Sequence, residues 1–394
     1  MIPSVIAATV VVLLWSLTAG RLEKWRVSAP MAMVAAGLAI GFTTRNVLGS
    51  GLNTEIAQHI AELILALLLF VDATAVKGGY LGHDGRTVLR LLLVALPLSI
   101  LITMGVGLLV LPGLGWAATL LIACIIMPTD FAPATSVVRD ARIPERIRHV
   151  LNVESGYNDG IVAPVFIFAL TLAGSHTQAN TPVEALQTAV PAAVLAVVVG
   201  VLVGGLSALA MNKATARHWA TEHSTRVATV AIPLLTYGVA IAVGGNGFVA
   251  AFLCGIAYKA ARKDASEAEF VLVDDVSALC GLAMWFVFGL AALLLFDFSV
   301  TWGAIVVALV ALTVARAGPV LAVLLGSDLR WRDRMTISFL APRGAASIVF
   351  GLLAFNSLDN EAADLALAIM VLTVLGSVLV HGVSTSLLTS RKRP

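Results

Sequence analysis

The chain has 394 residues, of which 59% are hydrophobic and 12% are charged, and its formal net charge is +2. Soluble domains are typically about 25% charged, so this composition excludes a soluble enzyme, a disordered chain and a small secreted domain. The near-balance of charge gives no indication of a nucleic-acid partner. The composition predicts an all-α polytopic membrane protein.

Thirteen segments are apolar enough to be transmembrane helices, which need about 20 residues each to cross a bilayer. In chain order they span 2–20, 27–43, 57–76, 89–111, 115–138, 149–173, 185–211, 227–245, 247–260, 270–296, 302–325, 335–355 and 363–387. The eighth and ninth segments are separated only by the glycines around Gly244–Gly247. No phosphate-binding loop of the Gly-x-x-x-x-Gly-Lys-Ser/Thr type occurs in the sequence, so we expect no bound nucleotide.

Basic residues alternate between the two sides of the predicted membrane. Of the 25 Lys and Arg residues, 22 fall on connections of one side, and the opposite connections hold only Arg45. Because Lys and Arg are enriched on the cytoplasmic side, we expect the N-terminus outside and the C-terminus in the cytoplasm. The expected location is the plasma membrane.

An odd helix number fits two inverted six-helix repeats joined by the seventh helix. The fifth segment contains Pro128 and Pro133, and its counterpart in the second repeat, the twelfth segment, contains Pro342. Proline removes a backbone donor and clashes with the preceding turn. We therefore expect helices 5 and 12 to be broken within the membrane.

Several charged residues lie inside the predicted spans, where a charge costs about 2.5–3.5 kcal/mol on insertion scales. They are Asp72, Asp130, Glu154, Asp159, Arg316 and Arg343. Four further polar residues near segment ends are expected to be interfacial or packed groups: Glu62, Asp274, Asp275 and His381.

The densest polar stretch is in the sixth segment, from Asn152 to Gly160. Residues four apart share a helix face, so Ser155 lies beside Asp159, and Glu154 lies beside Asn158. Carboxylate and hydroxyl oxygens suit a small hard cation, whereas Glu154 could pair with a buried arginine. Burial disfavours a charged carboxylate and a nearby cation favours it. Asp159 could therefore hold either a proton or a cation, which predicts an antiporter.

Four motifs resemble those of the monovalent cation/proton antiporter superfamily, specifically the NhaP-like sodium/proton antiporters and the eukaryotic sodium/proton exchangers. They are Pro128-Thr129-Asp130, Glu154-Ser155-x-x-Asn158-Asp159-Gly160, Gly247-Phe248-Val249-Ala250-Ala251-Phe252 and Pro342-Arg343-Gly344-Ala345. Many relatives have Thr-Asp-Pro where this chain has Thr129-Asp130-Phe131.

The resemblance implies that Asp159 is the essential ion- and proton-binding carboxylate. It further implies that the cation's oxygen shell is completed by Ser155, Asp130 and the main-chain carbonyl of Thr129, with Asp72 as a looser match. Glu154 would pair with Arg343. Asn158 replaces the second aspartate of electrogenic relatives, which implies exchange of one proton for one cation.

The resemblance also implies a homodimer within the lipid bilayer. Segments 1–76 and 185–296 would form a scaffold, and segments 89–173 and 302–387 a moving core. The expected partners are Na⁺ or Li⁺ and protons, with no cofactor. Because oxygen ligands alone do not fix the cation, a K⁺/H⁺ antiporter is an alternative, and a cation channel is another. An enzyme is not expected, since the chain has no His-Glu-x-x-His motif and its spans offer no Ser/His pair suited to an intramembrane hydrolase.

Overall fold

The computed structural model describes residues 2–25, 27–52, 55–76, 84–131, 142–174, 181–263, 265–296 and 300–390. Within these ranges the chain is helical and contains no β-strand. Among the described residues, eight helices are long and apolar enough to cross a membrane, and five shorter apolar helices accompany them. Their order follows the predicted segments. The number of crossings stays a prediction, because length and composition alone do not establish a crossing.

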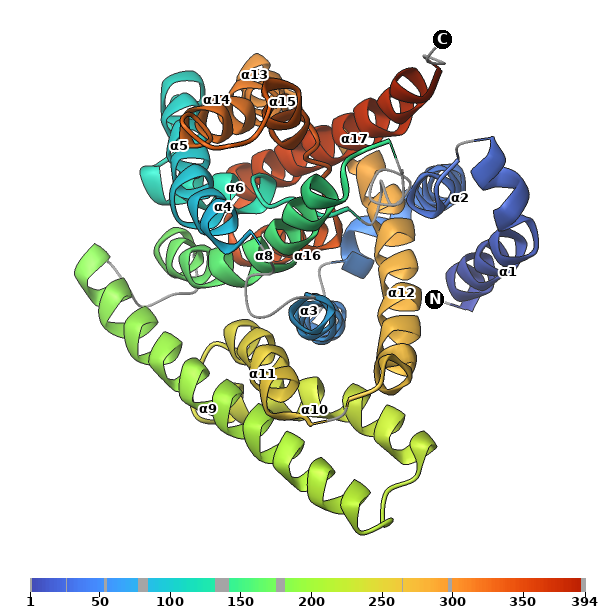
Figure 1. Cartoon of the computed structure of the whole chain (residues 1–394). Helices are drawn as coiled ribbons and strands as arrows, with labels where there is room; N and C mark the ends of the chain where they lie inside the picture. The colour runs from blue at the N-terminus through green and yellow to red at the C-terminus, as the bar shows by residue number, and fades with distance from the viewer. Residues whose placement is uncertain are drawn as a thin grey trace.

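Helix α3 lies near the centre of the molecule, and one group of helices extends from it, with α10, α11 and α12 in contact with it (Figure 1). The group comprises α1 (Ile2–Lys24), α2 (Ala29–Leu52), α3 (Glu55–Ala75), α9 (Pro182–Ala216), α10 (Glu222–Ala242), α11 (Gly247–Ala261) and α12 (Glu267–Ala291), which continues as the 3₁₀ turn η3 (Ala292–Phe296). Helix α11 packs between α9 and α3, and α12 packs along α2.

A second group contains α8 and the helices of the C-terminal third (Figure 1). It comprises α4 (Gly85–Arg90), the π-helical turn η1 (Leu91–Ala95), α5 (Leu96–Val110), α6 (Trp116–Ile126), α8 (Glu145–Ala173), α13 (Trp302–Leu312), α14 (Val314–Val323), α15 (Trp331–Phe339), α16 (Ala345–Ser357) and α17 (Asn360–Ser390). The two groups meet where α8 and α16 contact α3, and where α8 contacts α9 and α11. Helix α8, which carries the polar stretch, therefore lies at the junction.

The predicted eighth and ninth segments are separate helices. Gly244 adopts a φ of 78°, which lets the chain turn after α10. Asn246 then caps α11, because its Oδ1 accepts hydrogen bonds from the N–H groups of Phe248 at 3.0 Å and Val249 at 3.2 Å.

Both predicted helix breaks are present. Helix α6 ends at Ile126, and Pro128–Phe131 is not helical. The remainder of the predicted fifth segment, including Pro133, lies outside the described residues. Helix α15 ends at Phe339 and α16 begins at Ala345, so residues 340–344 are unwound within the twelfth segment.

The predicted segment 302–325 is present as the candidate membrane span Trp302–Val323, but its helix is interrupted once. Thr313, with φ −124° and ψ −95°, divides the segment into α13 and α14. Its hydroxyl donates to the carbonyl of Leu309 at 2.6 Å, a local bond that competes with regular helix geometry. The break leaves the carbonyl of Ala311 available for a tertiary hydrogen bond.

Candidate functional site

The two unwound stretches, Pro128–Phe131 after α6 and residues 340–344 before α16, are hydrogen-bonded to each other. The N–H of Asp130 donates to the carbonyl of Pro342 at 2.8 Å, and the N–H of Ala345 donates to Asp130 Oδ2 at 3.2 Å. The carboxylate therefore caps the N-terminus of α16, where the free amides favour a negative group. A Cβ atom on Gly344 would overlap this carboxylate, so the contact requires glycine.

Asp159 is buried on α8, with 5% of its surface exposed, and its Oδ1 atom has no hydrogen-bond partner. Gly160 lets the ring of Phe252 on α11 pack directly against α8 at this level. The carboxylates of Asp72 and Asp130 lie within electrostatic range of Asp159. A buried carboxylate in such surroundings is stabilised by binding a proton or a cation.

The carbonyl of Thr129, just past the end of α6, accepts hydrogen bonds from two polar side chains of α8. Ser155 Oγ donates to it at 3.0 Å, and Asn158 Nδ2 donates to it at 2.8 Å. Asn158 Nδ2 also lies 2.7 Å from the Thr129 hydroxyl oxygen. Because Ser155 contributes its proton to the carbonyl, the lone pairs of its oxygen stay available to a cation.

Asp72 lies in the last turn of α3, where that helix passes α8. A Cβ atom on Gly156 would lie 3.2 Å from the carbonyl oxygen of Asp72, so the two helices are in close contact here. Asp72, Asp130 and Ser155 are partly exposed, whereas Thr129 and Asp159 are buried. The structure thus brings together all five predicted ion-site residues, of which three are partly exposed.

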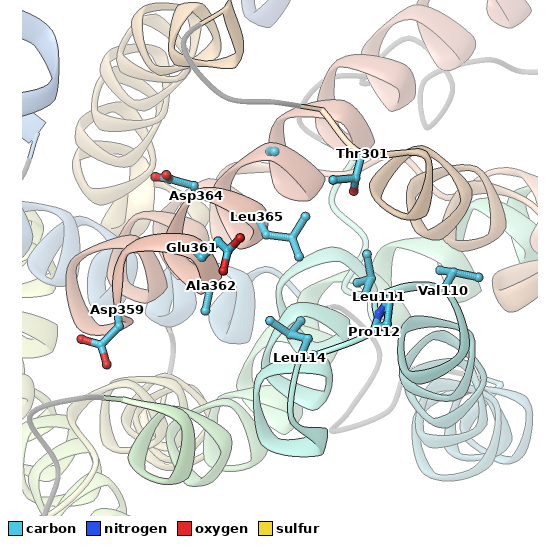
Figure 2. Close-up of a pocket in the computed structure, with 12 residues that line it drawn as sticks. Val110, Leu111, Pro112, Leu114, Thr301, Asp359, Glu361, Ala362, Asp364 and Leu365 are labelled. Carbon is cyan, nitrogen blue, oxygen red and sulfur yellow. The ribbon is translucent and has the colours of Figure 1, made fainter.

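A separate pocket of about 750 Å³ lies among the C-terminus of α5 and the beginnings of α13 and α17. Figure 2 shows its acidic side chains Asp359, Glu361 and Asp364 on the α17 side, opposite the apolar stretch Val110–Leu114. None of the five ion-site residues lines this pocket.

The profile of a family described as "Sodium/hydrogen exchanger, transmembrane" matches residues 6–391, nearly the whole chain. The chain belongs to the sodium/hydrogen exchanger family. It is therefore a multi-pass membrane protein of a transporter family.

Individual relatives of this exchanger-family chain are distant. A Na⁺/H⁺ antiporter of Schizosaccharomyces pombe is 27% identical over 205 residues, which cover 51% of this chain and 44% of the relative. A K⁺/H⁺ antiporter NhaP of Alkalimonas amylolytica is 26% identical over 345 residues, which cover 83% and 56%. The chain thus spans less than two thirds of the length of either relative.

The fold is similar to the structure of the sodium proton antiporter MjNhaP1 from Methanocaldococcus jannaschii at pH 8. The TM-score is 0.78 at 20% sequence identity, covering 97% of this chain and 99% of the other. This likeness shows that the two chains share a fold.

The predicted pairing of Glu154 with Arg343 is wrong for this exchanger-family chain. Glu154 pairs with Arg316 of α14, whose Nη1 and Nη2 each lie 2.8 Å from one carboxylate oxygen. Both side chains are buried, and the pair is bidentate, the geometry that best compensates two desolvated charges. The break at Thr313, which the sequence did not predict, begins the short helix that carries Arg316.

Arg343 instead binds backbone carbonyls that the helix breaks leave without helical donors. Its Nη1 donates to Met127 at 2.7 Å and lies 3.3 Å from the carbonyl of Pro128, and its Nη2 donates to Ala311 at 2.9 Å. A guanidinium has five donors and suits several carbonyls at once. Arg343 therefore ties three irregular stretches together.

Two residues of α17 belong to the same centre and were not predicted as part of it. Ser377 and His381 hydrogen-bond to the unwound stretch 340–344. His381 was expected to be an interfacial or packed polar group, and the structure shows it 5% exposed beside a helix break. The sequence offered one signal for them, since two polar residues four positions apart share a face of an otherwise apolar helix.

Proposed function

We propose that this exchanger-family chain exchanges Na⁺ or Li⁺ for H⁺ by alternate binding of either ion to Asp159. The observation that carries this proposal is the buried Oδ1 of Asp159, which lacks a hydrogen-bond partner. It lies on the helix face of Ser155, whose hydroxyl bonds the Thr129 carbonyl. Oxygen atoms of these kinds are the ligands that Na⁺ and Li⁺ take.

Obligatory exchange follows because the site is charged when it is empty, and a charged site is unfavourable inside the membrane. With neither ion bound, Asp159 is an uncompensated anion near the carboxylates of Asp72 and Asp130. Moving that charge across the membrane interior is unfavourable. The site crosses when Asp159 is protonated, or when a cation is bound by Asp159, Asp130, Ser155 and the carbonyl of Thr129. That carbonyl already accepts hydrogen bonds from Ser155 and Asn158, so it takes the cation in place of one of these two bonds. Asp72, which is partly exposed, attracts the cation and can add a ligand.

Asn158 supports electroneutral exchange. Its amide nitrogen lies within hydrogen-bond distance of both the carbonyl and the hydroxyl of Thr129, so it orders the broken end of α6, and the neutral side chain does not titrate. A single titratable group at this level of α8 fits one proton per cation. Glu154 forms a buried ion pair with Arg316 and is not one of the proposed ion ligands.

Alternating access would come from movement between the two helix groups. In this proposal α4–α8 and α13–α17, with the connecting stretches of 89–173 and 302–387, form the moving core. The helices of 1–76 and 185–296 form the scaffold and the contact of a homodimer. The location would be the plasma membrane, with the N-terminus outside and the C-terminus in the cytoplasm, as the distribution of basic residues favours.

A K⁺/H⁺ exchange on the same site is the second candidate, favoured by one observation. The relative from Alkalimonas amylolytica, named a K⁺/H⁺ antiporter, matches 83% of this chain. Cation preference depends on the size and rigidity of the oxygen shell, and the ligand types are the same for both ions.

The test is proton movement in liposomes loaded at acidic pH and containing the purified protein. Addition of Na⁺ or Li⁺ outside should make the interior alkaline, and Asp159→Asn should abolish the response. Asp359→Asn, which neutralises an exposed carboxylate at the start of α17, is the matched control and should respond like the wild type. A response to K⁺ alone would favour the second candidate. A cation-driven proton flux that persists in Asp159→Asn would contradict the single-carboxylate mechanism.

A further inference from the structure

Two side chains of α17 hold the unwound stretch between α15 and α16. The N–H of Arg343 donates to Ser377 Oγ at 2.8 Å, and the N–H of Ala341 donates to His381 Nε2 at 3.3 Å. These amides lie in a helix break and need acceptors from elsewhere. Ser377 is fully buried and His381 nearly so, which keeps water away from these amides. The side chains of α17 therefore supply the hydrogen-bond acceptors.

The same stretch reaches the ion site from its other side. The carbonyl of Pro342, between the two amides that α17 binds, accepts the N–H of Asp130 at 2.8 Å. Further along, the N–H of Ala345 binds the Asp130 carboxylate at 3.2 Å. A shift of Ala341 relative to His381 would therefore also move the adjacent residue Pro342, whose carbonyl is hydrogen-bonded to Asp130.

His381 Nε2 faces two backbone groups that require opposite protonation states. The N–H of Ala341 needs a bare nitrogen, whereas the carbonyl of Phe339, 3.2 Å away, needs an N–H. Nδ1 lies 2.9 Å from the carbonyl of Ser377, which places the proton of the neutral ring on Nδ1. A second proton, on Nε2, would replace the bond from Ala341 by a bond to Phe339.

The charged surroundings of His381 are dominated by Arg343. The elements packed against α17 are α6, α13, α16 and η3, and none of them contains a charged residue; Cys124 of α6 is their one titratable group. Helix α15 contributes three charged residues, Arg332, Asp333 and Arg334, and the guanidinium of Arg334 donates to the carbonyls of Ser327 and Leu329. On α17, the described acidic residues Glu361 and Asp364 lie in the first two turns, far along the helix. A positive charge on His381 would thus be repelled by Arg343.

We infer that His381 is a positioning residue whose protonation loosens the second helix break and slows exchange at acidic pH. This inference rests on the proposed function. The neutral ring holds Ala341, and with it Pro342 and Asp130, as the structure shows them. The charged ring releases Ala341 and repels the neighbouring guanidinium. This acid inhibition differs from proton competition at Asp159, because a saturating cation concentration does not remove it.

The test measures the maximal exchange rate at saturating Na⁺ between pH 7.5 and 4.5, a range that extends below the ordinary titration of histidine because Arg343 disfavours the charged ring. The wild type should slow by about threefold or more as a single-proton step. His381→Gln, which keeps a polar group near the Nε2 position and does not titrate there, should vary by less than about twofold. His223→Gln, at an exposed position on α10, is the control and should behave like the wild type. A step that persists in His381→Gln, or is absent from the wild type, would overturn the inference.

A second measurement separates this inference from the transport proposal. Hydrogen exchange of a peptide covering residues 337–348, corrected for the intrinsic effect of pH, should show less protection at pH 4.5 than at pH 7.5. The change should persist in the Asp159→Asn background and disappear when His381→Gln is added. If Asp159→Asn retains transport but this pattern holds, the transport mechanism fails and the role of His381 stands. If protection does not depend on His381, the role of His381 fails irrespective of transport.

Discussion

Removing the guanidinium of Arg316 should destabilise the protein, because it leaves the Glu154 carboxylate buried without its counter-charge. Glu154 is fully buried and Arg316 is 2% exposed, so water cannot replace the lost partner. Breaking a buried ion pair from one side costs about 3–5 kcal/mol. With an unfolding entropy of roughly 2.1 cal/mol/K per residue over 394 residues, this corresponds to a fall in Tm of about 4–6 °C for Arg316→Ala.

The assay is thermal unfolding of detergent-purified protein followed by intrinsic fluorescence, which the seven tryptophans provide. The control is Arg146→Ala, whose side chain is 41% exposed and pairs with Asp84 and Asp328. Exposed pairs contribute about 0–1 kcal/mol, so this variant should melt within about 1 °C of the wild type.

A double variant, Glu154→Gln with Arg316→Gln, removes both charges and should regain at least half of the loss in Tm. The pairing would be refuted if Arg316→Ala melted like Arg146→Ala. It would also be refuted if the double variant were less stable than Arg316→Ala, because the two charges would then not compensate each other.

Two further predictions concern the ion site. Gly344→Ala places a Cβ atom against the Asp130 carboxylate; we expect exchange to fall by at least about tenfold, while Gly318→Ala, whose Cβ meets open space, retains it. Transport rates in liposomes should depend little on an imposed membrane potential, since Asn158 carries no charge, and a clear acceleration by an inside-negative potential would count against one-for-one exchange.

Much of the fold could be predicted because the bilayer imposes simple rules on sequence. Apolar segments of sufficient length and the alternation of basic residues predicted the helices in order. Prolines next to polar residues predicted the breaks after α6 and before α16, since unpaired backbone is tolerated only where other groups bind it. The glutamate, serine, asparagine and aspartate of α8 share neighbouring faces by periodicity alone.

The partner of Glu154 could not be predicted in the same way. Two buried arginines were available, and which of them pairs with Glu154 depends on the break at Thr313. The break itself has neither proline nor glycine, and Pro319 lies six residues further on, inside α14. Arg343 could be recognised as buried, but its acceptors are carbonyls of two other irregular stretches, the one after α6 and the one at the break between α13 and α14. Backbone carbonyls carry no sequence signal. The contribution of His381 was missed for a similar reason, because its partners are backbone groups of Phe339 and Ala341.

The measurement that tests the central claim most directly is the KM for Na⁺ as a function of pH in liposomes containing the wild-type protein. If one carboxylate, Asp159, holds either the proton or the cation, protons compete with Na⁺. The KM should then rise by about tenfold for each unit by which the pH falls below the range in which the site is mostly deprotonated. A KM that stays constant over that range would show that the two ions bind at different groups, and would contradict the account.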